Sequence, residues 1–491
     1  MDIDFDTCYR AIQSRDARFD GRFFTAVTST GIYCRPICPA QTPQSRNVRF
    51  YPSAAATEAA GFRVCRRCRP DVAPQSHDWN IRADLAGRTL RLIAEGAVDT
   101  DRISGLARRL AVSPRHLHRE LLAEVGAGPL ALARTRRTQT ARLLIDESGM
   151  PLSEIAFVAG FGSIRQFNDS MRAAFGCNPT DLRRRTEPVP AGRGEITLRL
   201  RHRMPFDAGS LLTYLGRRAV PGVEQVADGC YRRTVAVGRS AGTIELEPVA
   251  GKAMVRLRLR LDELRDLALV VQRCRGLLDL DVDPATVSEV LGADPVLAPV
   301  VTARPGLRVP GTVDGWEIAV RAVLGQQVSV AAARTLAGRL AWALGTPLAE
   351  PERMLTHLFP RPEAVAEADL STLGITRARA DTLRGVAGAV ARGEIALDRG
   401  VDREEVEGRL IALPGIGAWT ASYIAMRALG DPYAFLPGDL GVRRAAEQLG
   451  LDPNPRRLEA YAERWRPWRA YAVLYLWESL STGTDALSRA V

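Results

Sequence analysis

Two close pairs of cysteines near the N-terminus are the feature that most restricts how this chain can fold. Cys34 and Cys38 lie in "TGIYCRPICPA", and Cys65 and Cys68 follow in "FRVCRRCRPD". Two such pairs predict a tetrahedral site in which four cysteine thiolates bind one zinc ion. The metal would stabilise a small domain, residues 1–78, whose own hydrophobic core is limited. The spacing alone leaves open whether the zinc only stabilises the fold or also presents a reactive thiolate.

Length and charge indicate a multidomain protein that binds a polyanion. A chain of 491 residues exceeds what one hydrophobic core supports. The N-terminus is polar and no apolar run is long enough for a membrane span, so we expect a cytoplasmic protein with reduced thiols and no membrane partner. Most of the net charge of +11 lies in residues 1–190, which favours nucleic acid as the partner. Arginine supplies nearly all of this charge, because Lys252 is the only lysine.

Changes in residue pattern divide the chain into four predicted domains of a multidomain α+β protein. After the cysteine-rich α/β domain, residues 81–186 place apolar side chains at three- and four-residue spacing, which predicts an all-α domain. Residues 195–302 begin with the alternating segment "ITLRLRHRM" and include "AMVRLRLRL", which predict strands in an α+β domain. Residues 303–491 show mostly helical patterns and are expected to form a second all-α domain.

The first helical domain contains the same unit twice. The segments "ISGLARRLAVSPRHLHRELLAEVG" and "LSEIAFVAGFGSIRQFNDSMRAAFG" each combine a short helix, a turn and a serine that can cap a second helix. The second helices, expected at residues 113–122 and 163–175, would enter the major groove of double-stranded DNA. The alternative is a pair of ordinary helical hairpins. The side chains expected to face the DNA are Arg115, His116, His118, Arg119, Arg165, Gln166 and Asn168.

A helix-hairpin-helix is predicted in "LIALPGIGAWTASYIAMRALGDPYAFLPGDLGVRRA". Gly415 and Gly417 would let backbone N–H groups approach a DNA phosphate at the start of the second helix. Asp439 follows the hairpin in a Gly-Pro-rich loop. The alternatives are a packing turn without DNA contact and an aspartate that only caps a helix.

The N-terminal segments resemble two known families. "STGIYCRPICPA" and "GFRVCRRCRPD" resemble the N-terminal domain of the Ada family across residues 5–75, and residues 81–186 resemble the AraC-type DNA-binding domain through "GF" and "CNPTDLRR". The first resemblance implies that Cys34 accepts a methyl group from a methylphosphotriester in DNA. Methylation of one thiolate lowers the charge of the site from about 2− to about 1−, which weakens its repulsion of DNA. The expected result is transcription activation, with RNA polymerase as a further partner.

Residues 195–480 resemble the AlkA branch of the helix-hairpin-helix glycosylases, 3-methyladenine DNA glycosylase II. The resemblance rests on "LRHRMPFDAGSLLTYLGRRAVPGVEQV", "GWEIAVRAVLGQQVSVAAAR", the hairpin and "WRPWRAYAVLYLW". It implies that Asp439 stabilises an oxocarbenium-like sugar and directs water. Gln327 stands where relatives insert a side chain into the base stack, and Leu440 and Gly441 stand where some relatives have bulkier residues. The implied pocket for a flipped, cationic base is lined by Trp419, Tyr423, Trp477 and Tyr214.

Together these features predict a monomeric, fused alkylation-damage protein that senses phosphotriesters, activates transcription and excises bases. Trp419 stands where bifunctional relatives carry a Schiff-base lysine, which predicts a monofunctional glycosylase without strand cleavage. No cysteine follows Cys274, which excludes an iron–sulfur cluster in the C-terminal part, and the Pro-Cys-His-Arg motif of a second methyltransferase is absent from the sequence. The alternative is a zinc-containing regulator whose C-terminal half binds DNA without excising bases.

Overall fold

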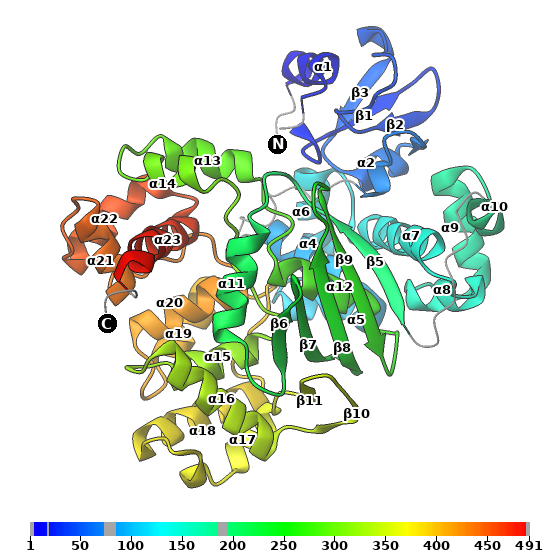
Figure 1. Cartoon of the computed structure of the whole chain (residues 1–491). Coiled ribbons are helices and arrows are strands. Elements are labelled where there is room, and N and C mark those ends of the chain that lie inside the picture. Colours follow the sequence, from blue (N-terminus) through cyan, green and yellow to red (C-terminus); the bar gives the residue numbers. More distant parts are fainter. Residues whose placement is uncertain (1–3, 17–18, 73–84, 185–194, 488–491) are drawn as a thin grey trace. The chain divides into compact units, whose positions relative to one another are not determined.

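The computed structural model describes residues 4–16, 19–72, 85–184 and 195–487, with only the backbone of residues 481–487 (Figure 1). The chain divides into two compact units. Unit 1 comprises residues 1–202, 237–240 and 254–272, and unit 2 comprises residues 203–236, 241–253 and 273–491. The boundaries predicted near residues 78–81 and 186–195 fall largely outside the described residues, and the four-domain division stays a prediction.

A four-stranded sheet of order β3-β1-β2-β4 brings the two cysteine pairs together. Strand β2 ends at Cys34, and the parallel neighbour β4 ends at Val64, directly before Cys65. Because parallel strands end at the same edge, both pairs emerge side by side. Phe23 and Val48 from this part pack against helix α1 in a small core. The elements are α1 (Phe5–Ser14), β1 (Phe24–Val27), β2 (Ile32–Cys34), β3 (Val48–Tyr51), α2 (Ala54–Ala59) and β4 (Arg63–Val64).

The next part is helical, as predicted, and contains both helix-turn-helix units. Ser113 caps α6 by accepting a hydrogen bond from the His116 N–H, and Ser163 caps α9 by accepting one from the Gln166 N–H. Leu117 and Leu121 of α6 are fully buried in the core of the first helix-turn-helix unit. The helices are α4 (Leu85–Glu95), α5 (Ala97–Arg109), α6 (Pro114–Val125), α7 (Pro129–Glu147), α8 (Leu152–Val158), α9 (Ile164–Phe175) and α10 (Pro179–Arg183).

The predicted strands at "ITLRLRHRM" and "AMVRLRLRL" are confirmed as β5 and β9, which pair antiparallel in unit 1. In unit 2, β6 pairs antiparallel with β7. Strand β8 also lies almost entirely in unit 2. The elements of this part are β5 (Ile196–Arg201), α11 (Ala208–Arg218), β6 (Glu224–Ala227), β7 (Cys230–Val237), β8 (Ser240–Pro248) and β9 (Met254–Leu261).

Helices dominate the remainder of the chain, which also contains a short hairpin, β10–β11. Trp316 and Val323 of α15 are buried at the centre of its large core. The hairpin predicted at "LPGIG" lies between α19 and α20. The elements are α12 (Leu267–Leu277), α13 (Pro284–Gly292), α14 (Ala298–Ala303), α15 (Gly315–Leu324), α16 (Val330–Leu344), β10 (Pro347–Glu352), β11 (Leu355–His357), α17 (Pro362–Glu367), α18 (Arg377–Ala391), α19 (Arg403–Ile411), α20 (Ala418–Ile424), the π-helical turn η5 (Ala425–Leu429), α21 (Leu440–Gln448), α22 (Pro455–Ala462) and α23 (Arg469–Leu487).

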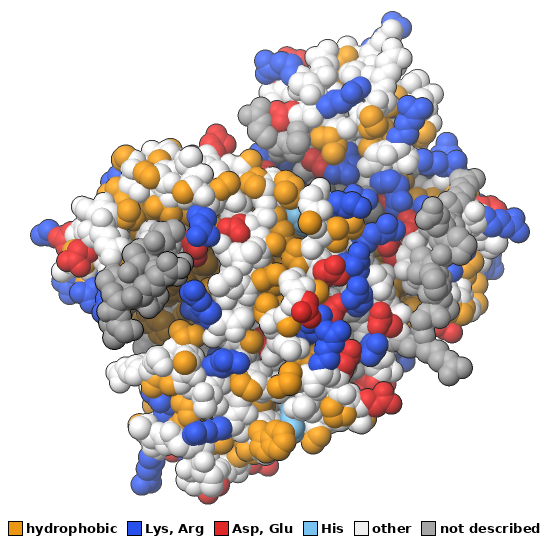
Figure 2. Space-filling view, viewed as in Figure 1, with side chains coloured by type: hydrophobic (Ala, Val, Ile, Leu, Met, Phe, Trp, Pro, Cys, Tyr) orange, Lys and Arg blue, Asp and Glu red, His pale blue; other side chains and the backbone are white. Residues whose placement is uncertain are grey.

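Charged side chains are frequent on the surface, as the composition suggests. Figure 2 shows Lys and Arg side chains over much of the visible face, with Asp and Glu side chains among them. Among the residues that the structure describes, no helix combines the length and the apolar character needed to cross a membrane.

Candidate metal centre and active-site cavity

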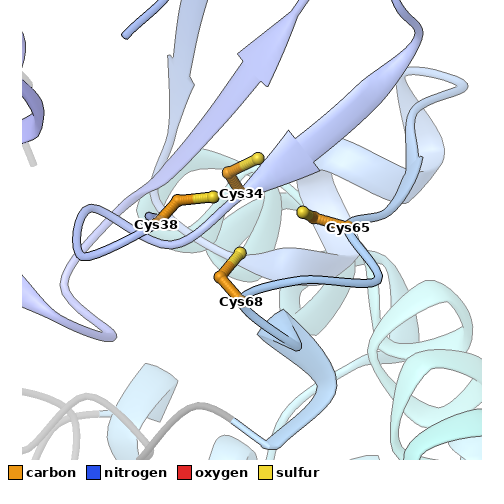
Figure 3. A group of neighbouring side chains, drawn as sticks. All are labelled: Cys34, Cys38, Cys65 and Cys68. Carbon is orange, nitrogen blue, oxygen red and sulfur yellow. The ribbon is translucent and has the colours of Figure 1, made fainter. Parts of the chain in front are cut away.

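The four predicted cysteines converge on one point. Their sulfur atoms all lie within 4.8 Å of one another, and Figure 3 shows the four side chains directed toward a common centre. None of them is in a disulfide. Four sulfur ligands at these separations fit a tetrahedral zinc ion, for which Zn–S bonds of about 2.3 Å place the sulfurs about 3.8 Å apart. The zinc predicted from the spacing is therefore supported by the geometry as well.

The four thiols differ in accessibility and in their hydrogen bonds. Cys65 and Cys68 are buried, whereas Cys34 and Cys38 are half-buried. The Arg35 N–H donates to the Cys68 sulfur at 3.3 Å. Hydrogen bonding from Cys34 lowers the pKa of Cys65, and hydrogen bonding with Cys38 raises the pKa of Cys34. Thiols in mutual contact thus cannot all ionise together, and a dication at the centre would remove that conflict.

A basic cavity of about 630 Å³ opens beside the half-buried thiols. Cys34, Cys38 and the buried Cys65 line it. Three arginines on or next to strand β4 line it as well, and their guanidinium groups are suited to contact DNA phosphates. These arginines are Arg63, Arg66 and Arg67.

The predicted DNA-reading residues lie mainly on exposed faces of the two second helices. Arg115 and His118 are exposed on α6, and Arg165 and Gln166 are exposed on α9. The Gln166 side-chain oxygen accepts a hydrogen bond from the Gly162 N–H at 3.0 Å, which ties that side chain to the preceding turn. Of the other three residues predicted to face DNA, Arg119 is exposed, whereas His116 and Asn168 are half-buried.

A second cavity, of about 1450 Å³, lies in unit 2. It brings together residues from α11, the segment after α15, the hairpin, and the starts of α20 and α21. The predicted residues that line it are Tyr214, Gln327, Gly415, Gly417, Trp419, Tyr423, Asp439, Leu440 and Trp477.

Asp439 is held in this cavity by three N–H donors. Its Oδ1 accepts hydrogen bonds from Trp477 Nε1 at 2.9 Å and from the Val442 N–H at 2.9 Å. Its Oδ2 accepts one from Trp419 Nε1 at 3.1 Å. The carboxylate therefore caps α21 and faces the cavity at once, so the two interpretations of this residue from the sequence do not exclude each other. The two indole donors are a contact that the sequence analysis missed.

The four predicted aromatic side chains form two stacked pairs. Trp419 and Tyr423 stack with ring centroids 5.3 Å apart and planes 12° apart. Tyr214 and Trp477 are nearly parallel, with centroids 6.5 Å apart. Flat aromatic walls of this kind suit a flipped base. Gly441 leaves room for the second pair, because a Cβ there would lie 3.0 Å from a Trp477 ring carbon.

Two arginines next to these rings were also missed. The Arg218 guanidinium lies 3.8 Å from the Tyr214 ring centroid, and Arg427 donates hydrogen bonds to the hydroxyls of Tyr214 and Tyr423. Each arginine follows a pocket tyrosine by four residues on a helical segment. That spacing is the signal that could have found them, because residues four apart lie on the same helical face.

The hairpin is fastened to the loop that carries Gln327. Gln326 donates from its side-chain amide to the Gly415 carbonyl at 2.9 Å and to the Thr420 hydroxyl at 3.1 Å. Gly415 has φ 85° and packs against Thr382, whose hydroxyl would lie 2.0 Å from a Cβ at this position. Gln327 has φ 55°, a conformation that non-glycine residues rarely adopt. The loop thus presents Gln327 at the cavity in a constrained backbone.

Four family models match successive parts of the chain. Residues 7–71 match the metal binding domain of Ada, and residues 106–185 match a helix-turn-helix domain family. Residues 197–314 match the AlkA N-terminal domain, and residues 320–470 match the HhH-GPD superfamily of base excision DNA repair proteins. The matches confirm the fold class and the family resemblances predicted from the sequence.

Individual relatives support the same family resemblances. A probable bifunctional transcriptional activator/DNA repair enzyme AlkA of Mycobacterium tuberculosis is 51% identical, over 98% of this chain and 97% of the relative. DNA-3-methyladenine glycosylase 2 of Escherichia coli is 37% identical, over 56% of this chain and 94% of its own length. A solved 3-methyladenine DNA glycosylase from Archaeoglobus fulgidus matches 57% of this chain and 97% of its own, with a TM-score of 0.51 and 22% identity, which is a likeness of fold.

Proposed function

Because this chain belongs to the family of the bifunctional transcriptional activator/DNA repair enzyme AlkA, we propose that it senses and repairs alkylated DNA through two separate sites. The cavity in unit 2 excises 3-methyladenine and related alkylated bases as a monofunctional glycosylase. The zinc–thiolate centre accepts a methyl group at Cys34 from a DNA methylphosphotriester. The methylated chain then binds promoter DNA through the two helix-turn-helix units and activates transcription with RNA polymerase.

The excision proposal rests on the position of Asp439 between two aromatic pairs in a cavity large enough for a base. Alkylation of a purine ring nitrogen makes the base cationic, so it leaves without much help from a general acid. As the glycosidic bond breaks, positive charge develops on the sugar, and the fixed carboxylate of Asp439 stabilises it. The same carboxylate orients the water that attacks the sugar, and the product is an intact abasic strand.

Release of 3-methyladenine by the Asp439→Asn variant tests this role. Asparagine caps helices well, so α21 should be preserved. The amide carries no charge, so we expect DNA affinity close to that of the wild type and a loss of excision of at least about 100-fold. Full activity of the variant would show that another carboxylate acts. A wild-type chain that binds DNA and releases no base would favour the regulator that lacks glycosylase activity.

The methyl-transfer proposal is supported by access to the sulfur. Cys34 is half-buried and lines the basic cavity. Cys68 is buried and accepts a backbone N–H, which withdraws electron density from its sulfur. In the reaction the Cys34 thiolate attacks the methyl carbon, an S–C bond forms, the O–CH₃ bond breaks, and the phosphodiester leaves as an anion. Zinc keeps the thiolate deprotonated when it is bound.

Mass spectrometry after incubation with methylphosphotriester DNA tests this assignment. We expect one added methyl group per chain, located on Cys34. The Cys34→Ala variant should take up none, whereas Cys177→Ala, outside the cluster, should react as the wild type does. A methyl group on Cys38, the other half-buried thiol, would overturn the choice of nucleophile and leave the zinc site intact.

A further inference from the structure

A buried arginine stands behind the aromatic wall of the large cavity. Arg427 lies on the π-helical turn η5, has only 3% of its surface exposed, and does not line the cavity. One terminal nitrogen donates to the Tyr214 hydroxyl at 2.6 Å and to the Tyr423 hydroxyl at 2.8 Å. The other two nitrogens donate to the backbone carbonyls of Pro310 and Gly311. The guanidinium therefore binds two backbone carbonyls through two of its nitrogens and the hydroxyls of two pocket tyrosines through the third.

These two tyrosines come from distant parts of the sequence. Tyr214 lies on α11 and Tyr423 on α20, and a single guanidinium fixes both ring ends. Because each phenol oxygen accepts from Arg427, its own O–H must point elsewhere, so the guanidinium also sets the direction in which the hydroxyls donate. π-Helical turns are rare and often occur at functional sites, which agrees with a positioning task for η5.

Arg427 also places a permanent positive charge close to the pocket. Its Cζ lies 5.1 Å from the Tyr214 ring centroid and 5.7 Å from that of Tyr423. A ring that already interacts with a guanidinium attracts a second cation less strongly, so a cationic base gains less from stacking here. During excision, the electron pair of the glycosidic bond moves onto the base, and a nearby positive charge favours that movement for every base.

We propose that Arg427 is a positioning and specificity-determining residue of excision, which aligns Tyr214 and Tyr423 and shifts the preference of the pocket from cationic toward neutral bases. The inference rests on the proposed glycosylase function. The Arg427 side chain then has two separate effects on excision. The hydrogen bonds align the pocket for all bases, and the charge changes the ratio between cationic and neutral ones.

Three variants of the full-length protein separate these effects. Arg427→Lys keeps the charge and cannot reach both hydroxyls and both carbonyls. Arg427→Met removes the charge as well. The double variant Tyr214→Phe/Tyr423→Phe removes the hydroxyl acceptors and keeps Arg427 and the rings. Arg308→Lys is the matched control, because Arg308 is 2% exposed in the same unit, binds backbone carbonyls, and does not line the cavity.

Single-turnover excision is measured on duplex DNA that contains either 3-methyladenine, which is cationic in DNA, or hypoxanthine, which is neutral. The melting temperature and the affinity for DNA with an abasic-site analogue are measured in parallel. We expect Arg427→Lys and the double tyrosine variant to lower both rates about tenfold and to leave their ratio unchanged. Arg427→Met should lower excision of hypoxanthine several-fold more than excision of 3-methyladenine. Arg308→Lys should lower the melting temperature and leave both the rates of the folded protein and their ratio unchanged.

Two results would overturn the inference. One is that Arg427→Lys excises both bases at the wild-type rates and that Arg427→Met leaves the ratio of the two excision rates unchanged. The other is a loss of rate in Arg308→Lys equal to that in the Arg427 variants, which would reduce Arg427 to a structural role. If Arg427→Met does not fold, the lysine and double tyrosine variants decide the positioning claim. A wild-type chain that releases neither base would contradict the proposed glycosylase function itself.

Discussion

The indole N–H of Trp477 should contribute to excision independently of its ring. Trp477 donates to Asp439 Oδ1 at 2.9 Å and lies nearly parallel to Tyr214. Trp477→Phe keeps an aromatic face and removes the donor. A hydrogen bond to a charged group contributes about 1.5–3 kcal/mol, and the half-buried position of Asp439 favours the lower end. A loss of about 1.5–2 kcal/mol in the transition state corresponds to a rate about 10- to 30-fold slower.

Single-turnover release of 3-methyladenine from duplex DNA measures this effect, and three comparisons sharpen it. Trp477→Ala should lose a further factor of about 2 to 10 with the ring. Trp342→Phe is the control, since Trp342 is 72% exposed on α16 and does not line the cavity. In an Asp439→Asn background the Trp477→Phe change should add much less, because the two residues act as one unit. A Trp477→Phe variant with the wild-type rate would refute the idea that the indole holds the carboxylate.

Further predictions concern the metal, stability and chemistry. The Cys65→Ser/Cys68→Ser variant should lose zinc and the folded structure of the N-terminal domain, since bound metal supplies much of a small domain's stability; metal analysis that finds zinc retained would contradict the ligand set. Burial raises the pKa of Asp279 to about 6, despite a hydrogen bond from Tyr471. Because the folded state holds this proton more tightly than the unfolded state, stability should fall by up to about 3 kcal/mol as the pH rises from about 4 to above 6. Asp279→Asn should remove that dependence in urea titrations, and an identical pH profile in both proteins would argue against it. Borohydride should trap no covalent adduct with damaged DNA, because the only lysine of the sequence, Lys252, does not line the cavity; a trapped adduct would show lyase chemistry.

Local patterns were sufficient to predict much of this architecture. The spacing of the cysteines predicts their convergence, because a short pair confines both thiols to one turn. Ser113 and Ser163 predict the starts of two helices, since a hydroxyl at that position satisfies a free backbone N–H. Alternation predicts β5 and β9, because side chains along a strand alternate between the core and solvent. In each case the signal lies within a few residues of the structure that it specifies.

Contacts between distant segments could not be predicted in the same way. Arg427 lies in the apolar run "YIAMRALG", where periodicity indicates only a helix, and its partner Tyr214 is 213 residues away. Nothing in the sequence shows that the Trp419 and Trp477 indoles meet at one carboxylate. The β10–β11 hairpin lacks clear alternation and has Pro347 and Pro351 in its first strand, so it gave no strand signal. Family resemblance placed the pocket residues in one region, whereas the hydrogen bonds among them depend on how distant segments of the chain fold together.

The two sites use separate sets of residues, Cys34 to Cys68 for one and Asp207 to Glu478 for the other. Methylation at the cysteine cluster would therefore leave the residues of the large cavity chemically unchanged. If Cys34 accepts a methyl group as proposed, the thioether is permanent, so each chain would record a single exposure until it is degraded or diluted by growth. The cavity, in contrast, would be restored after every excision by the proposed mechanism. A population of such chains would carry a memory of past damage in its methylated fraction while its capacity to remove bases stays constant.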